Sequence, residues 1–223
     1  MNKNFCRCAV LALLVAAWCS DVLAQAASAR EQLVAFTHDM NTLSAGFEQR
    51  VIGSDGEVQD ESAGKVWLSQ PHFFRWEYGG QYPEVVVADG LQIWIYDEVL
   101  EQVTIKPQSD LSADSPLSLL TDISKLDEQF EVREAGDLDG MMLLELRAVR
   151  EGSEFDRVLL GLQEDQLRFM AMEDAFGLRT EIRFSNVQRN PKLDSSLFVF
   201  SPPDGVDIIG EPGSDEPGAE SAD

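Results

Sequence analysis

Few side chains of this protein have the types and spacing that catalysis or metal binding requires. His38 and His72 are the only 2 histidines, and neither has a histidine or cysteine neighbour at metal-ligand spacing. Two acidic clusters lie at expected turns and lack the ligand spacing of a calcium-binding loop. They are Glu57, Asp60 and Glu61, and Asp137 and Asp139. Because no nucleophile elbow, zinc-protease helix or phosphate-binding loop occurs either, the sequence predicts no enzyme activity, no metal and no cofactor.

The N-terminal residues have the pattern of a secretory signal peptide. Lys3 and Arg7 give a positive start, and the apolar run at residues 9–18 is shorter than the roughly 20 residues that a membrane span needs. The tripeptide that ends at Ala24 matches a small-residue cleavage site. We therefore predict a signal peptide at residues 1–24, cleaved after Ala24; a retained membrane anchor is the alternative.

All three cysteines lie within this segment, as Cys6, Cys8 and Cys19. The mature chain would have no disulfide and no thiol nucleophile, although an exported compartment would permit disulfides. Its core must therefore be stable without them. A lipid-modified Cys19 is a second alternative, which the bulky Trp18 before it disfavours because a small residue is usual at that position.

The charge of the chain is strongly negative, with a formal net charge of −23 over 223 residues. Such a surface repels nucleic acid and anionic lipid headgroups, and it keeps a protein soluble while it carries apolar surface. Simple colloidal solubility explains the charge equally well. We expect one domain at residues 25–210, and a disordered tail at residues 211–223, which are acidic and have no large apolar side chain.

Aromatic and β-branched residues are concentrated in two stretches between Gly64 and Val103. Alternate residues of a strand share one face, so Phe74, Trp76 and Tyr78 should share a face and Arg75 should lie on the other. We expect Arg75 to pair with a neighbouring acid. Groups that could do chemistry are nearly absent, so the pattern predicts a large apolar surface built on strands.

Two segments have the apolar periodicity of helices, residues 29–41 and residues 114–126. Their apolar stripes are Leu33, Phe36, Met40 and Leu43, and Leu119, Leu120, Ile123 and Leu126. The other periodic segments read as short strands separated by turns, with Asp89-Gly90 as a strong hairpin signal. The expected strands are residues 45–52, 62–69, 73–78, 84–88, 92–97, 100–105, 129–134, 141–149, 157–163, 167–174 and 179–187, with a further one at 198–200 before Pro202-Pro203 ends the ordered domain.

Strands joined by tight turns predict an antiparallel meander that curls toward a barrel or half-barrel. A helix interrupts this meander and another precedes it. Helices packed on the concave side would close such a sheet without filling it, and a sheet of that shape can hold a ligand. The aromatic residues could equally fill an ordinary sandwich core, and the residues alone leave both readings open.

Six short patterns follow one another across residues 29–206. They are Phe47-x-Gln49, Gly64-x-x-Trp67, Pro71-x-x-Phe74-x-Trp76, Val87-x-Asp89-Gly90-x-x-x-Trp94-x-Tyr96, Glu101-Gln102-Val103 and Phe198-x-Phe200-x-Pro202-Pro203-x-Gly205-Val206. In their order and spacing they resemble the LolA family of periplasmic lipoprotein carriers. The resemblance implies a mainly β (α+β) fold: an unclosed antiparallel β-barrel of about eleven strands with a helical lid over an apolar cavity, as in LolA and LolB.

The resemblance also implies a function and its partners. A monomeric chaperone in the periplasm would bind the acyl chains of lipoproteins released by the inner-membrane ABC transporter LolCDE, and deliver them to the outer-membrane receptor LolB. It would perform no covalent chemistry and bind no nucleic acid. The expected cavity and rim residues are Phe47, Phe74, Trp76, Val86, Trp94 and Tyr96. The expected lid residues are Leu33, Phe36, Met40, Leu119, Leu120 and Ile123.

The sequence departs from the family pattern at one position. The family often has an arginine before the proline matched by Pro71, and this chain has Gln70 there, a neutral and weaker donor. Lid closure could therefore differ. The alternatives are a LolB-like anchored receptor, a periplasmic lipid-binding or sensor protein of the same fold, and an enzyme acting on lipids.

Overall fold

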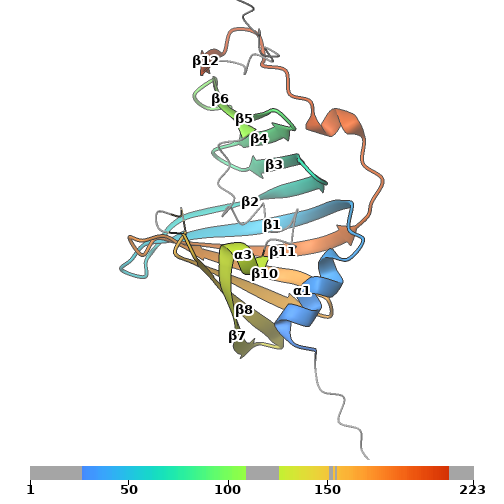
Figure 1. Cartoon of the computed structure of the whole chain (residues 1–223). Coiled ribbons are helices and arrows are strands. Elements are labelled where there is room, and N and C mark those ends of the chain that lie inside the picture. Colours follow the sequence, from blue (N-terminus) through green and yellow to red (C-terminus); the bar gives the residue numbers. More distant parts are fainter. Residues whose placement is uncertain (1–26, 109–125, 151–152, 154, 211–223) are drawn as a thin grey trace, which may run out of the picture.

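The strands of this protein form one continuous sheet with 12 members (Figure 1). The computed structural model describes residues 27–108, 126–150, 153 and 155–210. The strands are β1 (Thr42–Ile52), β2 (Val58–Ser69), β3 (Phe73–Gly79), β4 (Glu84–Asp89), β5 (Gln92–Asp97), β6 (Gln102–Pro107), β7 (Phe130–Leu138), β8 (Met141–Ala148), β9 (Arg157–Gln163), β10 (Gln166–Glu173), β11 (Arg179–Arg189) and β12 (Asp207–Ile209). The described helices are α1 (Ala29–Thr37), α3 (Leu126–Gln129) and the 3-10 turn η3 (Ser195–Phe198).

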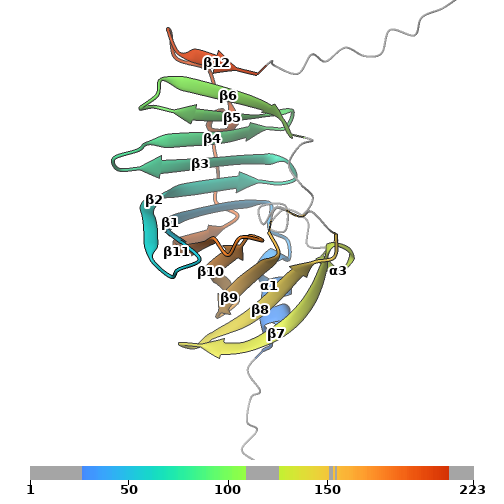
Figure 2. The same ribbon diagram turned by 90° about the vertical axis from the view of Figure 1, so that its left-hand side faces the viewer.

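The sheet consists of two antiparallel meanders joined side by side. β1 to β6 form one meander and β7 to β11 the other, and β1 pairs antiparallel with β11 where the two meet. β12 and β7 stand at the two ends of the strand order and do not pair, so the sheet is not closed (Figure 2). The expected unclosed antiparallel architecture is confirmed.

The C-terminal end of the sheet differs from the expectation. Asp207–Ile209 adds β12 beside β6 as a parallel strand, although Pro202-Pro203 was expected to end the ordered domain. The strand expected at residues 198–200 is absent, because Phe198 closes η3 and Val199 and Phe200 pair with no strand. A three-residue edge strand has too little periodicity to be recognised, and Ser195–Phe198 begins with a helical cap, since the Asp194 side chain accepts from Ser196 N.

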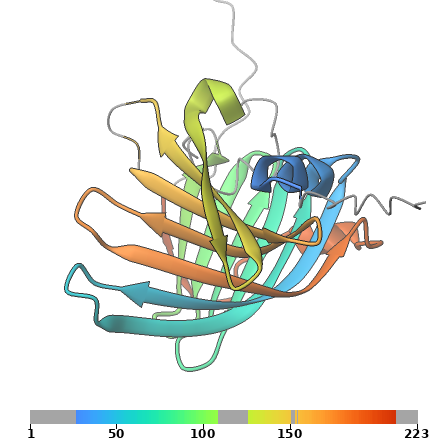
Figure 3. The ribbon, with the colours of Figure 1, turned by 90° about the horizontal axis from the view of Figure 1, so that it is seen from below.

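Helix α1 covers one face of the sheet, which we call the inner face; the opposite one is the outer face. The helix packs on β8, β9 and β10. Seen from below, the sheet curves and α1 lies on its concave side (Figure 3). Strand alternation places apolar residues of β8 to β11 on this face. They form one core with the helix: Leu33, Phe36, Met40, Leu144, Leu146, Val158, Leu160, Leu162, Met170 and Ile182.

Both ends of α1 are fastened to the sheet. Ser28 caps the helix in a reciprocal capping box with Glu31. The carboxylate of Glu134 on β7 accepts hydrogen bonds from the first helical N–H groups, at 3.0 Å from Ala29 N. At the other end, the Arg189 guanidinium of β11 donates to the carbonyl of His38 at 2.5 Å. The helix ends at Thr37, shorter than the expected range to residue 41, yet Met40 beyond it still points into the core.

The hairpin expected at Asp89-Gly90 is present with its turn displaced by one residue. Asp89 ends β4, and Gly90 and Leu91 form the two-residue turn before β5. Gly90 has a φ of +97°, which a residue with a side chain rarely adopts. The Asp89 carboxylate accepts from Leu91 N and Gln92 N at 2.9 and 2.8 Å, so it fixes this turn from within.

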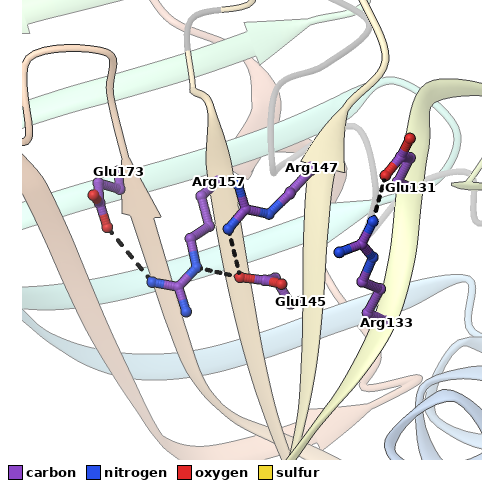
Figure 4. A network of polar contacts seen from close by, with 6 residues as sticks. All are labelled: Glu131, Arg133, Glu145, Arg147, Arg157 and Glu173. Atoms are coloured by element: carbon purple, nitrogen blue, oxygen red, sulfur yellow. Dashed lines mark hydrogen bonds and ion pairs between the residues drawn. The ribbon is translucent and has the colours of Figure 1, made fainter.

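The outer face of β7 to β10 has a row of ion pairs in place of a helix (Figure 4). Glu145 accepts from Arg157 at 2.6 Å and from Arg147 at 3.3 Å. Arg157 also reaches Glu173 of β10, with a closest N···O distance of 3.6 Å. Burial alone would raise the pKa of Glu145, but the two arginines outweigh it and hold the pKa below its ordinary value.

We predict that Glu145→Gln lowers the free energy of unfolding at pH 7 by about 1 kcal/mol, because the charged side chain, 15% exposed, is hydrogen-bonded twice. A depressed folded-state pKa stabilises the protein above the pKa of the unfolded chain, and this stabilisation is lost as the pH falls through the folded value. The difference between wild type and variant should therefore shrink in acid. Urea unfolding at pH 7 and below pH 4 measures it. Glu131→Gln, in a pair that is 62% exposed at this carboxylate, is the control and should change little.

Candidate functional site

The inner face carries a cluster of four aromatic side chains from β1, β3 and β11, which meet across β2. We call Phe47, Trp76, Tyr78 and Phe184 the aromatic cluster. The Phe47 ring centroid lies 4.8 Å from that of Trp76 and 5.2 Å from that of Tyr78, the latter edge to face. Phe184 meets Trp76 at 6.5 Å. Rings at these separations attract one another beyond their burial, so the cluster forms a continuous apolar wall.

A glycine between two strands makes this cluster possible. Gly64 of β2 pairs with Phe47 on one side and with Tyr78 on the other. A Cβ at Gly64 would collide with the carbonyl oxygen of Glu77 and would lie 2.9 Å from Phe47 Cε1. The missing side chain therefore lets the Phe47 and Tyr78 rings meet across β2.

The apolar wall continues from the aromatic cluster onto β4 and β5. Phe74, Ala88 and Ile93 form a buried group, and Val86 and Ile95 pack against it. The register explains this arrangement, since Trp76 pairs with Val86, which pairs with Ile95. Val86 and Ile95 are half-buried, so this part of the wall keeps accessible apolar surface in the structure.

A hollow of about 950 Å³ lies at the rim beside the aromatic cluster. It is bordered by the part of β2 that extends beyond β3 and by the turn between β3 and β4. Its lining comes from both faces of the sheet: Tyr78, Ser62 and Glu84 from the inner face, and Glu48, Lys65 and Arg183 from the outer face. Burial, together with the Glu84 charge, raises the pKa of Tyr78 to about 12, although the hydrogen bond to Gln49 at 3.3 Å opposes the shift. Tyr78 is therefore neutral at physiological pH. The lining mixes polar and apolar groups and is unlike the apolar inner wall.

The acidic side chains at this rim are unlike those of a metal site. Glu84 pairs directly with Asp97 across β4 and β5. Burial and the Asp97 charge raise the pKa of Glu84. Asp97 itself accepts from Val99 N and Leu100 N in the next turn. Among the described residues, no group of three or more His, Cys, Asp or Glu side chains could hold a metal ion.

The prediction that Trp94 and Tyr96 share a surface with Phe74 and Trp76 is wrong. Trp94 pairs with Val87, and Tyr96 pairs with Val85, so both lie on the outer face by alternation. Phe200 covers them there, with ring centroids 5.8 Å from each. The spacing of residues along β5 does not show which of its two faces lies beside the Trp76 face of β3. That depends on the register of β3, β4 and β5.

The segment that covers them crosses the outer face of β3, β4 and β5 on its way to β12 (Figure 1). We call residues 197–209 the C-terminal strap. Phe198 packs on Phe73 at 5.8 Å, and Arg75 donates to the Leu197 carbonyl at 3.2 Å. Arg75 also pairs with Glu77 at 2.5 Å, which confirms its expected outer-face position and its acidic partner.

The expected lid residues are partly placed. Leu33, Phe36 and Met40 are 2%, 0% and 1% exposed and lie in the inner-face core with Phe47 and Trp76. Leu119, Leu120 and Ile123 lie outside the described residues. Gln70, where the family often has arginine, uses its backbone N–H to donate to the Asn41 carbonyl at 2.8 Å, and thus links the end of β2 to the residue before β1.

The remaining candidates have ordinary surroundings. His38 is exposed and lies 3.0 Å from the Asp39 carboxylate, and His72 is exposed in the loop before β3. Sequence reasoning missed Ile93 and Ile95, which are on the inner face, because the neighbouring Trp94 and Tyr96 dominate the pattern.

Within the described part of the chain, no helix is both long and apolar enough to cross a bilayer.

These features define a class of protein: a curled, unclosed sheet with a helix on its concave side and an apolar inner wall. Residues 38–201 match the family model described as "Outer membrane lipoprotein carrier protein LolA". An outer-membrane lipoprotein carrier protein of Dechloromonas aromatica is 38% identical over 83% of this chain and 89% of its own length. One of Xanthomonas campestris is 40% identical over 83% and 90%. The chain belongs to the LolA family.

A solved structure of an uncharacterized conserved protein from Thermus thermophilus shares the fold. It superposes with a TM-score of 0.52 at 16% identity, and it covers 81% of this chain and 96% of its own. At this identity the likeness extends to the fold alone.

Gly64→Ala should lower the free energy of unfolding by about 2–3 kcal/mol, because the added Cβ meets the Glu77 backbone and the Phe47 ring. Gly79→Ala is the matched control. It lies on the partner strand, and its added Cβ would meet only the Ala63 carbonyl at 3.7 Å. Guanidinium unfolding of the two variants compares them. Equal stabilities would contradict the assigned close approach at Gly64.

Phe200→Ala should destabilise the protein by about 1–2 kcal/mol, since Phe200 covers both Trp94 and Tyr96. Val199→Ala, at a side chain that is 65% exposed, should stay within about 0.5 kcal/mol of wild type. Hydrogen exchange of the β12 amides provides a local measurement. If exchange in Phe200→Ala is as slow as in wild type, the strap is not held by this contact.

Proposed function

We propose that this protein is a periplasmic chaperone that binds the acyl chains of lipoproteins on the inner face of its sheet and carries them to the outer membrane. The observation that carries this proposal is the continuous apolar wall from Phe47 and Trp76 to Val86 and Ile95, beside a hollow at the rim. Membership of the LolA family, whose model is described as an outer-membrane lipoprotein carrier, supports it.

The physical need for such a carrier follows from the cost of exposing acyl chains to water. Each methylene gains about 0.8 kcal/mol on leaving water, so an acylated protein cannot cross an aqueous compartment unshielded. The wall offers apolar contacts over several strands with few hydrogen-bonding groups. A site of this kind holds chains of variable length and releases them without covalent chemistry, so we propose no enzymatic step.

The partners follow from the same proposal. The acyl chains would arrive from the inner-membrane transporter LolCDE and leave to the receptor LolB, with the carrier acting as a monomer after cleavage behind Ala24. Leu33, Phe36 and Met40 of the α1 segment would form part of the lid, in competition with ligand for inner-face surface. The charge of −23 supports repulsion from anionic membrane surfaces between loading and delivery.

Transfer tests the proposal directly. The mature protein is incubated with vesicles that contain the transporter and a triacylated lipoprotein, and the soluble fraction is assayed for a one-to-one complex. The complex should form, and the lipoprotein should move on to receptor-bearing membranes. If the lipoprotein stays in the vesicles although the carrier is folded, the function is that of a lipid binder or sensor with this fold.

Val86→Asn should reduce complex formation at least about tenfold, because it places an amide in the apolar wall. Val85→Asn is the matched control, since Val85 is similarly half-buried on the same strand but pairs with Glu77 and Tyr96 on the outer face. Val85→Asn should retain near-wild-type loading. Loss in both variants, or in neither, would remove the inner face from the binding site.

A further inference from the structure

The aromatic cluster contains a polar group that nothing in the described protein satisfies. Trp76 is 5% exposed, and its indole Nε1–H has no hydrogen-bond partner among the described residues. A buried donor without an acceptor costs about 1–3 kcal/mol, and most such donors in folded proteins are paired. The described part of the fold therefore leaves this donor without an acceptor.

The indole N–H of Trp94, in contrast, has a hydrogen-bond partner within the fold. On the outer face its Nε1–H donates to the Asp89 carboxylate at 2.7 Å. Partial burial pushes the pKa of Asp89 up, but this bond and those from Gln92 and Leu91 hold it below its ordinary value. Trp76 lies on the inner face. Its partners on the neighbouring strands are Val66 and Val86, and both are apolar.

A second unsatisfied group lies on the same face. The Oγ of Ser62 is buried without a partner among the described residues, and Ser62 lines the hollow at the rim. The register places it on the inner face, since Ser62 follows the alternation of Gly64 and Val66 along β2. Of the three unsatisfied buried side-chain atoms in the described part of the chain, the third belongs to Ser153 in the loop between β8 and β9.

We infer that Trp76 Nε1–H is a hydrogen-bond donor for the carbonyl oxygen of a bound acyl group. This inference rests on the proposed function, and it adds a polar anchor to a site otherwise described by apolar contact. The carbonyl is the one strong acceptor at the head of an acyl chain. Chains on the wall formed by Val86 and Ile95 would bring that carbonyl to the aromatic cluster. The bond sets how deeply a chain enters, whatever its length.

Two probes that differ only at this carbonyl test the inference. One is a lipopeptide with two ester-linked C16 chains, and the other is its analogue with two ether-linked C16 chains. Wild-type protein should bind the ester about fivefold more tightly, the ratio that corresponds to one net hydrogen bond. Trp76→Phe should bring the ratio close to one through weaker ester binding. Trp94→Phe is the matched control and should keep the wild-type ratio, because its N–H lies on the outer face.

A measurement on the unmodified protein makes the test independent of how well the variants fold. In proton–nitrogen spectra, the indole N–H resonance of Trp76 should move downfield on addition of the ester probe but not of the ether probe. The Trp94 resonance should stay in place with both. Equal affinity of wild type for the two probes, or an ester preference that survives in Trp76→Phe, overturns the inference and leaves the carrier function standing. Failure of wild type to bind either probe overturns both.

Discussion

The structure depends on the need to cover the inner face of a single curled sheet. Alternation makes this face apolar on nearly every strand, so it cannot be left to water. Helix α1 covers β8 to β10, and its buried side chains join those strands in one core. The wall of β3 to β5 joins this core through Trp76, but Val86 and Ile95 on the wall are only half-buried. The inner face is thus one apolar surface, and its half-buried part at Val86 and Ile95 is where the proposed ligand would first make contact.

The outer face is covered by two different means, which correspond to the two meanders. Over β7 to β10 the covering is a row of ion pairs centred on Glu145 and Arg157. Over β3 to β5 it is the C-terminal strap, which seats Phe198 and Phe200 on outer-face aromatic rings. The strap then pairs with β6 as β12, so it also protects an edge that would otherwise expose backbone groups. These outer-face contacts add stability without using side chains of the inner wall of β3 to β5.

The sequence predicted most of the strands and the unclosed architecture, because period-two alternation and strong turns are local signals. The division of the site residues between two faces could not be predicted. Phe74 and Trp76 share one face, as alternation predicted, but Trp94 and Tyr96 lie on the other face, and only the register of β3, β4 and β5 shows it. β12 escaped prediction for a related reason, since its pairing with β6 joins segments about a hundred residues apart. Local patterns specify strands well and the partners of strands poorly.

The two faces of β3 to β5 differ in whether their polar side chains have hydrogen-bond partners. On the outer face, the indole of Trp94 has its carboxylate, the guanidinium of Arg75 has Glu77 and the Leu197 carbonyl, and the rings have Phe200. Each partner restricts motion and adds to the stability of the fold. On the inner face, the indole of Trp76 and the hydroxyl of Ser62 have none within the described residues. A buried polar group without a hydrogen-bond partner destabilises the folded protein. Where a ligand supplies the missing partner, the same free energy adds to the affinity for that ligand.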